Sequence, residues 1–123
     1  MAAVDYLRSL GDGSLDVAFE RIQAHEDALA HRFLDGFPKS GELYGIRSVE
    51  GRTPTFCFNV PGQSPRAVAE RLGQRGLYVW DGDYYALEPM RALGLSERGG
   101  AVRAGFLHYT SADEVDRLLE ALA

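Results

Sequence analysis

Hydrophobic residues recur at helical spacing in several segments of the chain. In the segment 14–35 they form one apolar stripe, which consists of Leu15, Phe19, Ile22, Leu29 and Phe33. A serine that can cap a helix opens three of the segments, and the last one begins with a capping box from Ser111 to Glu114. The pattern predicts helices over residues 2–10, 14–35, 64–75 and 111–122.

Alternation of side chains marks strands between these helices. In the strand expected over 101–107, one face carries Val102, Ala104 and Phe106, and the other carries Ala101, Arg103, Gly105 and Leu107. Further strands are expected over 43–46, 55–60 and 77–80. The turn-like segment 49–54 joins the first two into a hairpin, and Asp81-Gly82 is expected to end the third.

The order of these elements indicates the fold class. Helices and strands follow one another without the strict alternation of a doubly wound sheet, and residues 84–94 add only one or two helical turns. This order predicts an α+β fold, with a small, mainly antiparallel sheet and helices packed on one face. The 123 residues are 46% hydrophobic and 25% charged, which is typical of a single globular domain.

Composition also excludes several classes of partner. No apolar run approaches the roughly 18 to 20 residues that span a bilayer, so we expect no membrane insertion. A net charge of −5 argues against nucleic-acid binding. The opening residues lack the basic leader and long apolar stretch of a secretion signal, so we expect a cytoplasmic protein.

Most side chains that could bind a metal or act as nucleophiles are better interpreted as surface or packed residues. His25 and His31 are six residues apart and point about 120° from each other on a helix, so we expect no metal site. Cys57 lies in mid-strand among aromatic residues, which favours a packed thiol over a nucleophile. An aromatic cluster lies among acidic residues and forms either an acid-lined pocket or an interface patch; it contains Tyr78, Trp80, Tyr84 and Tyr85.

Arg103 is the most unusual residue of the last strand. It stands on the face that also carries Ala101 and Gly105. Because both neighbours are small, the charged side chain of Arg103 has open space around it on the sheet. Two explanations are open from the residues alone. The guanidinium either pairs with an acidic residue of its own domain or binds a ligand.

The stretch "AVRAGFLHYTSADEVDRLLEAL" resembles the closing motif of the class V aminotransferase and cysteine desulfurase family, pyridoxal-phosphate enzymes of fold type I. The resemblance extends over essentially the whole chain. It implies that the chain is the C-terminal small domain of such an enzyme, with residues 1–12 as the end of an interdomain helix. It also implies that Arg103 binds the α-carboxylate of an amino-acid substrate and that Gly105 leaves room for it.

The loop "WDGDYYA" departs from the desulfurase pattern. Desulfurases commonly carry an Arg-x-Gly here and a catalytic cysteine three places after that glycine, whereas this chain has Trp80 and Tyr85 at the two positions. A phenol cannot accept sulfur as a persulfide, which argues against ordinary desulfurase chemistry. Trp80 and Tyr85 are therefore expected to contribute to substrate binding, and no residue of this chain is assigned a catalytic role.

Pyridoxal phosphate is the cofactor that the resemblance implies for the full-length enzyme. The family's imine-forming lysine follows a histidine in the large domain, whereas the single lysine here, Lys39, lies in the turn "FPKSG". We therefore expect that the chain alone binds no cofactor and is inactive. Its expected partners are the large cofactor-binding domain, an amino-acid substrate and a second copy in a homodimer. The alternative is a stand-alone α+β module that binds a small ligand or a protein without catalysis.

Overall fold

The structure is a computed structural model that describes all residues from 1 to 123. Its helices are α1 (Ala2–Ser9), α2 (Leu15–Gly36), α3 (Pro65–Gly73), α4 (Leu87–Ala92) and α5 (Ala112–Leu122), with a 3₁₀ turn at Ser96–Arg98. Its strands are β1 (Glu42–Tyr44), β2 (Thr55–Asn59), β3 (Trp80–Gly82) and β4 (Ala101–Gly105). No helix combines the length and the apolar character needed to cross a membrane.

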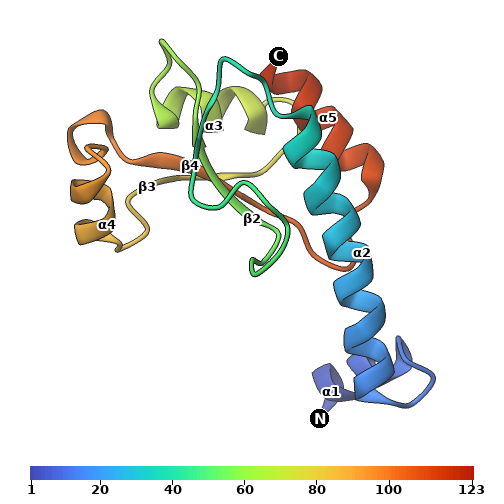
Figure 1. Cartoon of the computed structure of the whole chain (residues 1–123). Helices are drawn as coiled ribbons and strands as arrows, with labels where there is room; N and C mark the ends of the chain where they lie inside the picture. Colours follow the sequence, from blue (N-terminus) through green and yellow to red (C-terminus); the bar gives the residue numbers. More distant parts are fainter.

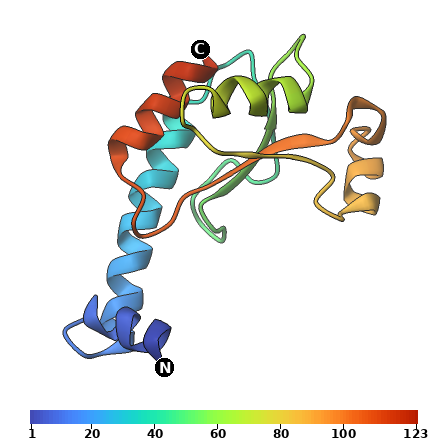
Figure 2. The same ribbon diagram turned by 180° about the vertical axis from the view of Figure 1, so that it is seen from behind.

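The four strands form one antiparallel sheet in the order β1-β2-β4-β3. Helices α2, α3 and α5 gather on one side of this sheet, and α4 stands at the end of the molecule opposite α2 (Figures 1 and 2). The α+β class with a small antiparallel sheet is thus confirmed.

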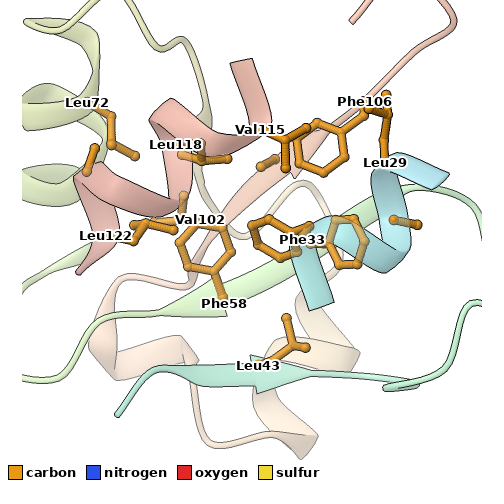
Figure 3. Packing of buried hydrophobic residues seen from close by; sticks show 14 of the residues in the cluster. Leu29, Phe33, Leu43, Phe58, Leu72, Val102, Phe106, Val115, Leu118 and Leu122 are labelled. Atoms are coloured by element: carbon orange, nitrogen blue, oxygen red, sulfur yellow. The ribbon is translucent and has the colours of Figure 1, made fainter. Parts of the chain in front are cut away.

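The hydrophobic core lies between the sheet and the three helices (Figure 3). Phe33 of α2 is fully buried at its centre, and its ring lies 4.3 Å from that of Phe56 and 5.5 Å from that of Phe106, measured between centroids. Val102 and Ala104 of β4 face the same core. The alternation read from the sequence of β4 therefore places its apolar side chains as expected.

The opposite face of the sheet carries a smaller apolar cluster. Met90 of α4 and Leu95 pack against Ala101 of β4, and Cys57 and Tyr84 lie at the edge of this cluster. Thus α4 and the residues after it cover one end of the second face. The remainder of that face, around Arg103, is left open.

The apolar stripe of α2 is buried over only part of its length. Leu29 and Phe33 are buried, whereas Phe19 is 54% exposed. The first half of α2 extends beyond the sheet and carries α1 at its far end (Figure 1), so no partner covers Phe19. No residue of α1 is buried, and its Tyr6 hydroxyl meets the His108 ring at 3.0 Å.

The strand expected over 77–80 is wrong in its bounds. Trp80 is the first residue to pair with β4, opposite Arg103, and the strand continues through Asp81-Gly82 instead of ending there. Leu77 and Val79 pack on the core without forming part of the ladder. The last strand likewise ends at Gly105, two residues earlier than expected, although Phe106 remains buried.

Gly100 is required where the chain enters β4. A Cβ built at this position would lie 2.1 Å from the carbonyl oxygen of Gly82 in β3, so the two backbones touch. The φ angle of Gly100 is +83°, a conformation that favours glycine. This contact sets the spacing between β3 and β4 and hence the position of the open face.

We expect Gly100→Ala to lower the free energy of unfolding far more than Gly99→Ala does. Both glycines have positive φ, so both variants carry a strain of about 1–2 kcal/mol, but a Cβ at Gly99 meets only the Cδ of Pro65 at 4.0 Å. The clash should cost Gly100→Ala about 1–3 kcal/mol more. Urea unfolding of the two variants measures the difference, and equal losses would contradict the close contact.

Candidate functional site

The open face of the sheet is centred on Arg103. This residue lies in the middle of β4, between Cys57 of β2 and Trp80 of β3, its cross-strand neighbours. Its side chain is exposed, and no acidic side chain forms an ion pair with it. The first of the two explanations drawn from the sequence, a partner carboxylate within the domain, is therefore not what the structure shows.

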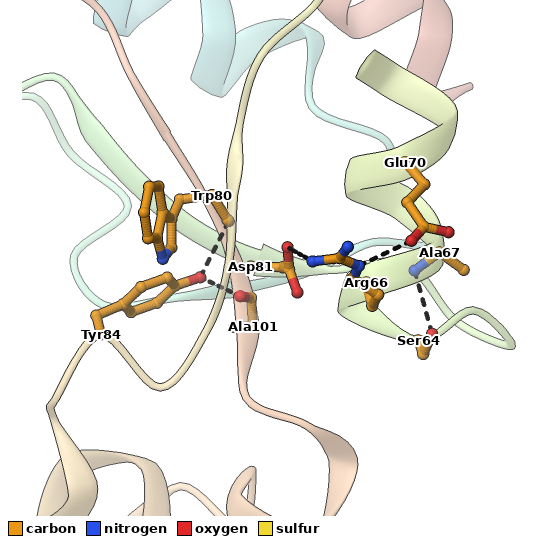
Figure 4. Close-up of polar contacts among 8 residues, drawn as sticks. All are labelled: Ser64, Arg66, Ala67, Glu70, Trp80, Asp81, Tyr84 and Ala101. Atoms are coloured by element: carbon orange, nitrogen blue, oxygen red, sulfur yellow. Dashed lines mark hydrogen bonds and ion pairs between the residues drawn. The ribbon is translucent and has the colours of Figure 1, made fainter. Parts of the chain in front are cut away.

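An aromatic ring supports the Arg103 guanidinium. Its Cζ lies 4.9 Å from the ring centroid of Tyr84, within the range of a cation–π contact. The Tyr84 hydroxyl donates to the backbone carbonyl of Ala101, and the Trp80 carbonyl lies 3.4 Å from the same hydroxyl (Figure 4). Burial raises the pKa of Tyr84, so this hydroxyl stays protonated in neutral solution.

Arg103 borders a depression of about 540 Å³ on the sheet surface. Its lining is mainly apolar and aromatic and consists of Thr55, Tyr78, Val79, Trp80, Arg103, Gly105, Phe106 and Leu107. A Cβ added at Gly105 would meet only the Thr55 Oγ1 atom, at 3.6 Å, which is ordinary contact. The depression thus offers a charged group beside open space, and three of the four predicted site residues line it together.

Tyr85 is the predicted site residue that lies apart from Arg103. It is 99% exposed and lines a second depression, of about 460 Å³, together with Trp80 and Tyr84. Its φ of +59° follows a φ of +55° at Tyr84, and two successive left-handed residues turn the chain sharply here. Trp80 lines both depressions.

The acidic residues near the aromatic cluster have local partners. Asp81 lies 3.8 Å from the Arg66 guanidinium of α3, which also pairs with Glu70 (Figure 4). The Asp83 carboxylate accepts a hydrogen bond from the Tyr85 backbone N–H at 3.0 Å. Glu88 pairs with Arg91. These carboxylates are therefore held by neighbouring groups instead of facing the guanidinium of Arg103.

Histidine and cysteine side chains are dispersed over the molecule. His25 lies 2.8 Å from the Thr110 carbonyl oxygen, His108 meets Tyr6, and His31 is exposed. No three His, Cys, Asp or Glu side chains are arranged to hold a metal ion. Cys57 is half-buried beside Arg103, and burial raises the pKa of its thiol, although the guanidinium acts in the opposite direction.

The residues of this chain do not fit the imine that pyridoxal phosphate forms with a lysine. Lys39 is exposed in the turn after α2 and is not among the residues that line either depression beside β4. No other lysine occurs in the sequence. A cofactor imine would therefore need a lysine from outside these residues.

The sequence identifies Tyr84 only as a member of the aromatic cluster and gives it no role of its own. Two consecutive tyrosines follow Asp81-Gly82-Asp83, and this pattern could have indicated a role for Tyr84. The tight turn there points the two rings in different directions. The cross-strand register of β3 and β4, which brings Tyr84 to Arg103, cannot be read from that local pattern.

Comparison with known proteins agrees with this architecture. A family model described as aminotransferase class-V matches residues 2–118. A probable cysteine desulfurase of Methanothermobacter thermautotrophicus is 30% identical over 98% of this chain, and one of Pyrococcus abyssi is also 30% identical over 98%. The apo structure of a cysteine desulfurase from Thermococcus onnurineus superposes with a TM-score of 0.78, at 33% identity over 85% of this chain.

The fold and the sequence together define a domain of the kind found in class V aminotransferases. The chain belongs to the aminotransferase class-V family. It spans 29% and 28% of the two archaeal relatives and 26% of the Thermococcus chain, so it corresponds to a small part of each.

We expect Cys57 to react more slowly with iodoacetamide at pH 8 than a cysteine in a short peptide, because burial raises its pKa and restricts access. Replacing Arg103 with methionine should slow the reaction further, since the guanidinium favours the thiolate. The rate of alkylation is followed by mass spectrometry. A rate that equals the peptide's, or that rises in Arg103→Met, would show that the Cys57 environment is described incorrectly.

Proposed function

We propose that this chain is the C-terminal small domain of a pyridoxal-phosphate enzyme and that Arg103 binds the α-carboxylate of its amino-acid substrate. The observation that carries the proposal is an exposed guanidinium without an acidic partner, beside the open space at Gly105. Membership of the aminotransferase class-V family supports the same assignment.

The chemistry of the guanidinium suits a carboxylate. Arginine presents two parallel N–H groups that match the two carboxylate oxygens, and it keeps its charge at any physiological pH. The neighbouring ring of Tyr84 makes a cation–π contact with the guanidinium and carries no negative charge that would compete with the substrate. An acidic side chain at this place would compete with the substrate, and none is present.

The other predicted residues are assigned to the surroundings of the carboxylate. Gly105 leaves the space in which the carboxylate end of the substrate lies, and Trp80 lines both depressions. Tyr85 is assigned to substrate binding from the second depression. A phenol cannot take up sulfur as a persulfide, so the proposal assigns this site no desulfurase step through Tyr85.

The remaining parts of the site are assigned to other segments of the protein. Pyridoxal phosphate supplies an electron sink for reactions at the α-carbon of amino acids. Its lysine and phosphate contacts are assigned to a large domain, to which residues 1–12 lead, and the complete enzyme is proposed to act as a homodimer. The exposed side chains of Val4 and Tyr6 in α1 and of Phe19 in α2 suit a surface covered by that domain.

We expect Arg103→Ala in the complete enzyme to lower kcat/KM for the amino-acid substrate by roughly two to four powers of ten. The estimate corresponds to two charge-assisted hydrogen bonds of about 1.5–3 kcal/mol each. Arg103→Lys should recover only part of the loss, because the charge remains and the two-pronged geometry does not. Steady-state kinetics gives the values, and near-normal kcat/KM in Arg103→Ala would refute the assignment.

Gly105→Val is the matched variant, because it fills the space and leaves the charge in place. An added Cβ here meets only Thr55, so we expect the fold to accept the variant while substrate binding weakens. The absorption spectrum of bound pyridoxal phosphate should be the same in all three variants. Loss of cofactor in Arg103→Ala would indicate that the guanidinium contacts the cofactor and not the substrate.

We expect the isolated chain to form no stable imine with pyridoxal phosphate and to turn over no amino acid. The reason is the position of Lys39, exposed in a turn and away from Arg103. The absorption spectrum after mixing, followed by borohydride reduction and peptide mapping, measures this. A stable imine fixed onto Lys39 would overturn the assignment of the cofactor to a separate domain.

A further inference from the structure

We propose that Tyr84 is a positioning residue that holds the Arg103 guanidinium in place for carboxylate binding. This inference rests on the function proposed for Arg103 and adds the group that orients it. It concerns the placement of the arginine and assigns Tyr84 no contact with the reacting atoms.

The Tyr84 ring lies close to the Arg103 guanidinium. The Arg103 Cζ lies 4.9 Å from the centroid of the Tyr84 ring, and Tyr84 is the only aromatic ring that the guanidinium faces at this distance. An exposed arginine otherwise samples many rotamers, and fixing it in one of them costs side-chain entropy. A ring that already restricts the guanidinium before the ligand arrives reduces that cost at the moment of binding.

Tyr84 is anchored to the strand that carries Arg103. Its hydroxyl donates to the backbone carbonyl of Ala101, two residues before Arg103 in β4. Figure 4 shows the phenol reaching from the turn across β3 to this carbonyl. The ring also packs at the edge of the apolar cluster of Met90, Leu95 and Ala101. The ring therefore moves with β4 and keeps its place relative to the guanidinium.

The turn that presents Tyr84 has an unusual backbone conformation. The φ angles of Tyr84 and Tyr85 are +55° and +59°, and neither residue is glycine. A left-handed backbone is unfavourable for a residue other than glycine, so contacts elsewhere must hold the turn in this conformation. Asp83 contributes one of these contacts through the Tyr85 N–H, and the Tyr84 hydroxyl contributes another. These contacts hold the strained turn in one conformation and so fix the position of the Tyr84 ring.

The contact can be tested in this chain by NMR of the arginine side chains. A ring near the guanidinium shifts the δ-proton signals of Arg103, and Tyr84→Leu should return them to the range of exposed arginines. Tyr84→Phe, which keeps the ring, should retain most of the shift. Arg52 is an internal reference, because its Cζ lies 4.2 Å from the Phe56 ring centroid and far from this turn in sequence. Its signals should be unchanged in both variants.

Tyr85→Leu is the matched control for this measurement. Tyr85 has the same left-handed backbone as Tyr84, but it is 99% exposed and does not face Arg103. Its replacement should leave the Arg103 signals where they are. The proposal is overturned if Tyr84→Leu leaves the Arg103 signals unchanged, or if Tyr85→Leu shifts them as much as Tyr84→Leu does.

The positioning role is tested by kinetics of the complete enzyme. Tyr84→Leu should raise KM by roughly two- to fivefold with a smaller change in kcat, as expected for loss of one cation–π contact. Tyr84→Phe should restore KM only in part, because it keeps the ring and loses the hydroxyl that anchors the ring to Ala101. In the Arg103→Ala background, Tyr84→Leu should add no further loss. An unchanged KM in Tyr84→Leu, or an equal loss in both backgrounds, would overturn the positioning role. If Arg103→Ala alone is harmless, the function proposed for Arg103 fails, and the positioning role fails with it.

Discussion

The antiparallel pairing of β2, β4 and β3 is the constraint on which the rest of the structure depends. Strand β4 lies between its two neighbours, so its alternation sends Val102 and Ala104 into the core and Arg103 to the opposite face. Because the core side is closed by the three packed helices, the register cannot slip by one residue without burying the charge. The packing of the phenylalanines thus fixes the direction of the guanidinium on the other face.

The face of the sheet opposite the core is only partly covered, and its uncovered part surrounds Arg103. The cluster around Met90 and Leu95 closes only one end of it, and the turn after β3 delivers Tyr84 to the border of the open part. The backbone contact between Gly82 and Gly100 keeps this turn close to β4. A charged group, an aromatic support and an open depression therefore arise from one arrangement of two short strands, which is consistent with the carboxylate-binding role proposed above.

The sequence was sufficient to predict most of the fold, because helix caps and apolar periodicity are local signals. Ser14, Ser64 and Ser111 cap α2, α3 and α5 in the structure. It was insufficient for β3, because the bounds of an edge strand depend on its partner, and β3 pairs where Arg103 lies. It also misjudged Phe19, since periodicity does not reveal how far a helix extends beyond its sheet. Within the site, β4 alternation predicted the face of Arg103, but the ring of Tyr84 approaches it through a turn with two unusual φ values.

The central claim is that the fold does not need the Arg103 charge, which leaves the guanidinium free for a ligand. The most direct measurement is the free energy of unfolding of Arg103→Met, compared with the unchanged chain in urea at neutral pH. Loss of an exposed cation–π contact without any ion pair should lower it by no more than about 1 kcal/mol. A loss above about 2 kcal/mol would show that the guanidinium is a structural group of its own domain and would contradict the account.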